Sequence, residues 1–124
     1  MKGFLFTLAL FFAGSVCASE FKTLDDAMKM AKKEDKKVFL YFGTSWCPGC
    51  REMKRVFKNE DVQRKMESLP YVIVDCDDDD GDLLRKYRIS SIPDYMIIDN
   101  NGEIVKRTKG AMSVSRFLKW LGEE

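Results

Sequence analysis

Cys47 and Cys50 lie three positions apart, separated by Pro48 and Gly49. A continuous apolar run, residues 38–43, precedes them, and a segment with helical patterning follows. Two cysteines at this spacing, between a buried strand and a helix, suit reversible disulfide chemistry. We expect Cys47 at the helix N-terminus, where free backbone N–H groups and the helix dipole favour an anion such as a nucleophilic thiolate. Cys50, one turn later and facing the core, is then the resolving thiol.

A cysteine pair can also bind a metal or form a structural disulfide. A zinc site needs four ligands, but the chain has no histidine, and Cys76 is the only further cysteine beyond residue 18. No metal ligand and no cofactor are therefore predicted. A purely structural disulfide would close too short a loop to stabilise the fold well. A module that binds copper(I) or a client protein through the two thiols remains an alternative, because soft thiolates suit copper(I).

The rest of the chain predicts one domain of alternating helices and strands. Caps are expected at Thr23, Asn59, Asp80 or Asp82, and Ser113 or Ser115. The expected elements are helix 21–34, strand 38–43, helix 48–57, a short helix after residue 59, strand 71–75, helix 82–87, strands 95–99 and 103–108, and a last helix.

An acidic run, residues 77–80, follows the strand expected at 71–75. An EF-hand loop needs spaced oxygen ligands, a central glycine and a distant glutamate, and this run does not match that pattern. It is interpreted as a solvated loop that leads into a helix. Cys76 is expected as a small, buried side chain at the strand end, with a redox or mixed-disulfide role as the alternative.

Three segments together resemble the thioredoxin superfamily: residues 38–50 its active-site strand and motif, residues 89–94 its cis-proline loop, and residues 95–105 its closing hairpin. The resemblance implies an α/β fold with a central mixed sheet flanked by helices. It also implies a thiol:disulfide oxidoreductase with Cys47 and Cys50 as catalytic residues. The Ile92–Pro93 bond is expected to be cis and to lie against the sulfurs.

The resemblance also assigns a client-binding surface. In that family an extended client peptide pairs with the backbone before the cis-proline, in the manner of an added strand. We expect Trp46 to pack beside the sulfurs. The substrate-binding residues implied are Trp46, Pro48, Gly49, Ile92 and Pro93.

The direction of electron transfer is expected to be reductive. The pattern at residues 56–62 is similar to the C-terminal domain of the transmembrane thiol:disulfide interchange reductase. The Pro48-Gly49 dipeptide matches neither common thioredoxins nor strong oxidants, histidine is absent, and Asp94 is expected to add negative charge near the sulfurs. A disulfide isomerase is the alternative enzyme, but the chain has no spare length for the dimerisation segment that isomerases usually carry.

One departure from thioredoxins concerns proton movement at Cys50. The residue six positions before Cys47 is Tyr41, where thioredoxins usually carry a buried aspartate. We expect water, the Tyr41 hydroxyl or the region of Lys36 and Lys37 to take over that role.

Residues 1–18 have the layout of a secretory signal peptide, with Lys2, a short apolar stretch and small residues before an expected cleavage after Ala18. A retained anchor and a lipoprotein acylated at Cys17 are the alternatives. The expected thioredoxin-like domain is 19–124, a periplasmic or secreted monomer without a membrane span after cleavage. Expected partners are client proteins with disulfides or thiols and a redox donor protein. The net charge of +1 implies no attraction to nucleic acid.

Overall fold

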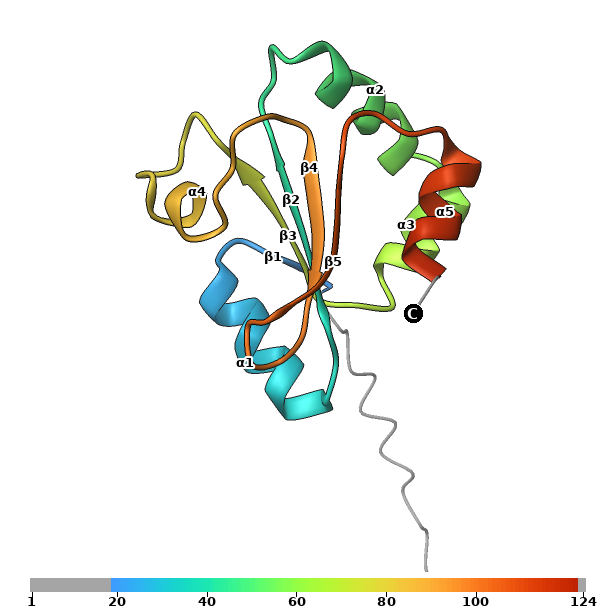
Figure 1. Cartoon of the computed structure of the whole chain (residues 1–124). Coiled ribbons are helices and arrows are strands. Elements are labelled where there is room, and N and C mark those ends of the chain that lie inside the picture. Colours follow the sequence, from blue (N-terminus) through green and yellow to red (C-terminus); the bar gives the residue numbers. More distant parts are fainter. Residues whose placement is uncertain (1–18, 123–124) are drawn as a thin grey trace, which may run out of the picture.

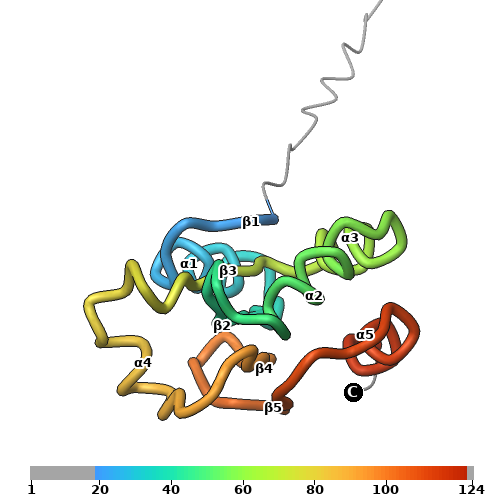
Figure 2. Tube along the Cα trace, turned by 90° about the horizontal axis from the view of Figure 1, so that it is seen from above, coloured from blue at the N-terminus to red at the C-terminus, as the bar shows by residue number. Residues whose placement is uncertain are grey.

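The computed structural model describes residues 19–122 and contains a five-stranded mixed sheet with helices on both faces (Figure 1). The expected leader, residues 1–18, lies outside the described residues. The strand order is β1-β3-β2-β4-β5, as the view from above shows (Figure 2). The elements are β1 (Glu20–Phe21), α1 (Leu24–Glu34), β2 (Val38–Gly43), α2 (Pro48–Phe57), α3 (Glu60–Met66), β3 (Tyr71–Asp75), α4 (Asp82–Lys86), β4 (Asp94–Ile98), β5 (Ile104–Lys109) and α5 (Val114–Gly122).

Strand β2 is the centre of the sheet, and all six of its residues are buried. It pairs in parallel with β3 and antiparallel with β4, which confirms the mixed sheet. A strand covered on both faces needs a nearly continuous apolar sequence, and residues 38–43 supply one. The antiparallel register places Phe42 opposite Asp94. The chain therefore leaves β2 toward the cysteine motif next to the point where it enters β4.

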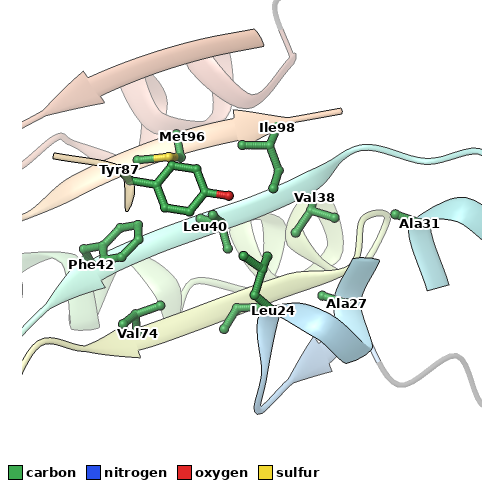
Figure 3. Packing of buried hydrophobic residues seen from close by; sticks show 11 residues of the cluster. Leu24, Ala27, Ala31, Val38, Leu40, Phe42, Val74, Tyr87, Met96 and Ile98 are labelled. Carbon is green, nitrogen blue, oxygen red and sulfur yellow. The ribbon is translucent and has the colours of Figure 1, made fainter. Parts of the chain in front are cut away.

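Two hydrophobic cores lie on opposite faces of the sheet. Helices α1 and α4 cover one face, and α2, α3 and α5 cover the other (Figure 1). The first core, shown in Figure 3, includes Leu24, Ala27, Ala31, Val38, Leu40, Phe42, Val72, Val74, Tyr87, Met96 and Ile98. The second includes Phe39, Tyr41, Met53, Val56, Val62, Met66, Tyr95, Ile97, Met112 and Phe117.

Three expected helix caps are confirmed. The Thr23 hydroxyl accepts a hydrogen bond from Asp26 N at 3.2 Å, and the Asn59 side chain accepts from two backbone N–H groups of α3. Ser113 Oγ accepts from Arg116 N at 3.3 Å at the start of α5. Each cap satisfies a donor that the first helical turn leaves unpaired.

Several expected boundaries and one expected cap were wrong. Phe21 belongs to β1 rather than to the first helix, because it pairs with Val72 of β3. The N-cap of α4 is Gly81, with φ of 96°, and it makes no side-chain cap. Asp80 instead accepts a hydrogen bond from Asp82 N, and so forms a local turn before the helix. The hairpin strands also lie one residue from their expected positions, with bounds 94–98 and 104–109.

No helix within residues 19–122 is long and apolar enough to cross a bilayer.

Candidate active site

The cysteine motif lies where β2 ends and α2 begins, above the sheet in Figure 1. Cys47 is the N-cap of α2, and its Sγ accepts a hydrogen bond from Cys50 N at 3.3 Å. Pro48 occupies the first helical position, where a missing N–H costs nothing. The sequence prediction that Cys47 lies at a helix N-terminus, with Cys50 one turn in, is thus confirmed. Both thiols are free.

The loop before β4 lies against this motif. The Ile92–Pro93 peptide bond is cis, as the family resemblance implied, and the Cys47 thiol donates to Ile92 O at 3.7 Å. Gly49 also faces this loop, because a Cβ built on it would lie 3.0 Å from Pro93 Cδ. Glycine is therefore used here for close approach of α2 to the loop, in addition to any backbone freedom. Residues 45 positions apart in sequence thus meet at one sulfur.

Both cysteines of the motif are buried, although only Cys50 was expected to face the core. Cys50 is 3% exposed, as expected for a resolving thiol, but Cys47 is only 5% exposed. The carbonyl of Ile92 covers Cys47 on one side and the first turn of α2 covers it on the other. The Cys47 sulfur is therefore not presented openly at the protein surface.

Trp46 is largely exposed and is held by the acidic loop after β3, while its packing beside the sulfurs stays a prediction. Its side chain is 61% exposed, and its indole N–H donates to Asp77 Oδ2 at 2.9 Å. The indole needs a hydrogen-bond acceptor, and the acidic loop after β3 supplies one. Nothing in the sequence indicated this partner 31 residues away. The exposed ring and the acidic loop consequently form one continuous surface next to the motif.

The second cysteine has Tyr41 as its neighbour. The Tyr41 ring is buried in the core, and its side chain lines the same small cavity as Cys50, with the hydroxyl close enough to influence the pKa of that thiol. Burial raises the pKa of Cys50, and the hydrogen bond to Cys47 raises it further. The backbone of Thr44 and the Tyr41 hydroxyl act in the opposite direction. Among the side chains expected to take part in proton movement, Tyr41 is therefore the one near the Cys50 sulfur.

Lys36 and Lys37 are not near Cys50, and that alternative was wrong. They precede β2, whereas the motif follows it, and six strand residues span roughly 20 Å. Lys36 pairs with Glu34 at that far end of the strand.

Asp94 is fully buried at the start of β4, directly after the cis-proline. Both of its oxygens accept from Arg107, at 3.0 and 2.6 Å, and Lys109 lies 4.0 Å away. Its negative charge is therefore balanced locally, and the expectation that it adds net negative charge near the sulfurs was wrong. Sequence reasoning missed Arg107, because only the β4–β5 register brings it beside this carboxylate.

Cys76 is half-buried and packs at the edge of the first core. Burial is the largest cause and the charge of Asp75 the second of a rise in its pKa to about 11. These features fit the prediction of a small structural side chain. No group of three or more metal-ligating side chains occurs in residues 19–122.

Comparisons with known proteins agree with this geometry. Residues 24–123 match the family model for the thioredoxin-like domain. The sporulation thiol-disulfide oxidoreductase A of Bacillus subtilis is 26% identical, over 82% of this chain and 76% of its own length. Thiol:disulfide interchange protein DsbD 2 of Pseudomonas aeruginosa is 30% identical over 77% of this chain, but the match spans only 17% of that protein.

Superposition on solved structures also gives the thioredoxin fold. A thioredoxin from Thermus thermophilus superposes with a TM-score of 0.72 at 27% identity and covers 85% of both chains. The C-terminal domain of Neisseria meningitidis DsbD superposes with a TM-score of 0.67, covering 79% of this chain and 90% of the domain; at 24% identity this supports the fold alone.

The chain belongs to the thioredoxin-like family. Its fold and its free dithiol define a disulfide oxidoreductase, which confirms both the fold class and the enzyme class predicted from the sequence.

Proposed function

We propose that this protein is an exported reductase of client disulfides, with Cys47 as nucleophile and Cys50 as resolving thiol. The observation that carries the proposal is the position of Cys47 Sγ. It caps α2 at 3.3 Å from Cys50 N and lies 3.7 Å from Ile92 O beside the cis-proline. A sulfur at a helix N-terminus is favoured as a thiolate, the form that attacks disulfides. A carbonyl next to it offers an acceptor to an incoming peptide backbone.

The cycle balances two electrons. The Cys47 thiolate attacks one sulfur of a client disulfide; a mixed disulfide forms, and the other client sulfur leaves as a thiolate. Cys50 then loses its proton and attacks Cys47 Sγ, the mixed disulfide breaks, and the second client thiolate leaves and takes up a proton. The client gains two electrons, and the Cys47–Cys50 pair becomes a disulfide that a redox donor protein must reduce again.

The client surface in this proposal is the junction of α2 with the cis-proline loop. Ile92 supplies backbone pairing, while Gly49 and Pro93 lie where the two segments meet most closely. Trp46 and Pro48 are exposed next to this junction. An exposed aromatic side chain held by a hydrogen bond is a low-entropy contact for a peptide.

The reducing direction and export are supported by sequence features. The chain contains no histidine that could stabilise an oxidising thiolate, and residues 1–18 have a signal-peptide layout. We infer a periplasmic or secreted monomer made of residues 19–124, because an oxidising compartment is where disulfide clients occur.

The test is reduction of insulin by dithiothreitol, with the wild-type protein compared with Cys47→Ser and Cys76→Ser. We expect catalysis to disappear in Cys47→Ser and to persist in Cys76→Ser, since only the former removes the attacking sulfur. Equal rates in all three proteins would contradict the proposal. Equilibration with glutathione then gives the reduction potential of the pair, and a strongly oxidising value would reverse the proposed direction.

Replacement of Cys50 by Ala identifies clients. The mixed disulfide can then form but is not resolved, so Cys47 stays attached to its client. Mass spectrometry of trapped adducts from periplasmic or secreted protein would name the partners. Tight copper(I) binding by the wild-type protein without insulin turnover would instead favour the non-catalytic dithiol module.

A further inference from the structure

A part-open cavity of about 140 Å³ lies behind the resolving cysteine, between the end of β2, the end of β3 and the side of α2 that carries Cys50, Lys54 and Phe57. It has room for several water molecules. Its lining is mostly apolar, and it contains Cys50 together with the side chain of Tyr41. The cavity therefore gives solvent a route to a thiol that is otherwise 3% exposed.

The Tyr41 ring reaches this cavity because residue 43 is glycine. A Cβ built on Gly43 would lie 2.7 Å from Tyr41 Oη and 2.8 Å from Cε1, too close for any real contact. The ring thus folds back over the Gly43 backbone, and the hydroxyl is brought to Cys50. Two other rings pack against the Tyr41 ring. The Phe57 ring packs edge-on with 4.8 Å between ring centroids, and the Tyr95 ring is tilted with 5.4 Å between centroids.

We propose that Tyr41 acts as a hydrogen-bond donor to the Cys50 sulfur while that sulfur attacks Cys47, a role that deepens the proposed reductase function and depends on it. The hydroxyl keeps its proton throughout the cycle. The Cys50 proton passes to solvent water along the cavity, the new Cys47–Cys50 bond forms as the mixed disulfide breaks, and the client thiolate leaves.

The chemistry of a buried phenol favours a donor over a base. Burial raises the pKa of Tyr41 far above its ordinary value, and the hydrogen bond to Cys50 raises it further. A group that so rarely ionises does not take a proton from a thiol, but its O–H can stabilise negative charge on sulfur. Tyr41 acts to lower the pKa of Cys50, which is the effect expected of a hydroxyl that donates to the sulfur.

Other charged and titratable groups near Cys50 are less suited to this role. Cys47 is its reaction partner, and the Tyr95 hydroxyl already donates to Gly110 O at 2.8 Å. Cys76 is affected by Cys50 only through charge, and its own pKa is raised, so it is a poor donor or base for this step. Lys54 and Asp75 line the cavity, but the Asp75 side chain accepts from Asp77 N at 2.9 Å and is exposed.

The experiment separates the two chemical steps. Reduced protein that carries Cys17→Ser and Cys76→Ser reacts with a slight deficit of Ellman's reagent in a stopped-flow spectrometer. Attack by Cys47 releases one coloured thionitrobenzoate, and resolution by Cys50 releases the second. In Tyr41→Phe we expect an unchanged first release. The second release should slow at least about tenfold, which corresponds to about 1.4 kcal/mol, and its pH midpoint should rise.

Three further variants keep the result interpretable. Gly43→Ala should slow the second release as well, because the added methyl group displaces the Tyr41 ring. Tyr87→Phe is the matched control, since it removes another buried hydroxyl in the opposite core and should change neither release. Asp75→Asn should also leave both releases unchanged.

The outcomes distinguish the two proposals. If the wild-type background releases no thionitrobenzoate, or releases only the first equivalent, the proposed reductase cycle itself fails. If it releases both and Tyr41→Phe behaves identically at every pH, only the role of Tyr41 is overturned. Slowing by Asp75→Asn without slowing by Tyr41→Phe would overturn it in favour of a carboxylate base.

Discussion

Asp94 and Arg107 form a two-pronged ion pair directly behind the cis-proline, with Asp94 oxygens 3.0 Å from Nε and 2.6 Å from an Nη atom of Arg107. The carboxylate is completely buried. The guanidinium also donates to Arg88 O at 3.4 Å, while neighbouring Lys109 donates to Ser90 Oγ at 3.3 Å. The pair and its neighbours therefore tie the loop that carries Ile92 to strands β4 and β5.

Arg107→Met should destabilise the fold severely, because it leaves the Asp94 carboxylate buried without its main partner. Loss of one member of a buried pair costs about 3–5 kcal/mol, a large part of the stability of a small domain. Urea unfolding followed by circular dichroism measures the loss. The double variant Asp94→Leu with Arg107→Met should recover much of it, since no unpaired charge remains.

Arg85→Met provides the matched control for that prediction. Arg85 pairs with Asp82 at 2.7 Å, but both side chains are more than 70% exposed. Exposed pairs contribute only about 0–1 kcal/mol. Equal destabilisation by Arg85→Met and Arg107→Met would show that burial of the Asp94 pair carries no special cost.

Asp77→Ala should weaken client binding without slowing chemistry. The Asp77 carboxylate accepts the Trp46 indole N–H at 2.9 Å and thereby orients an exposed ring beside the motif. A hydrogen bond of this kind contributes about 1 kcal/mol, so KM for insulin should rise about threefold to tenfold with kcat unchanged. Asp78→Ala removes the same charge from the next residue and should leave KM unaltered. A rise in KM with both variants would point to charge rather than to the indole contact.

Cys76 should be a slow thiol in the folded protein. Its pKa is raised to about 11, from 9.0, so at neutral pH it carries about 100-fold less thiolate than an ordinary cysteine. Iodoacetamide alkylation of Cys76 in a Cys17→Ser, Cys47→Ser, Cys50→Ser protein, followed by mass spectrometry, should keep accelerating as pH rises above 9.

The same shift has a consequence for stability. Because the folded state prefers the protonated thiol, its contribution to stability is complete below pH 9 and is lost as pH rises toward 11. For the alkylation experiment, the control is the protein unfolded in urea, in which the rate of Cys76 alkylation should level off near pH 9. A folded-state profile that also levels off there would contradict the shift.

Local sequence patterns predicted the elements that carry the site. The apolar run 38–43 gave β2 with its correct bounds, and the cysteine-proline junction gave the start of α2. Thr23 and Asn59 cap the helices they were expected to cap. These features depend on neighbours within a few positions, so the sequence contains the information needed to predict them.

Contacts between distant segments could not be predicted in this way. Strand β1 is only two residues long and exists because β3 lies beside it. The Trp46–Asp77 hydrogen bond and the Asp94–Arg107 pair join residues 31 and 13 positions apart. Each depends on strand order and register, which decide which side chains meet across the sheet.

The pairing of Phe42 with Asp94 fixes the position of the cysteine motif relative to the cis-proline loop. Because the sulfur motif and the cis-proline loop extend from adjacent strands, a slip of one residue would shift one against the other by about 3.3 Å and turn Asp94 to the opposite face. Residues 76–88 lie outside this ladder and include the acidic loop that holds Trp46. Under the proposed function, charge changes in the acidic loop would alter the docking of client proteins while the strand register keeps the distance between Cys47 Sγ and Ile92 O, so specificity and chemistry would evolve separately.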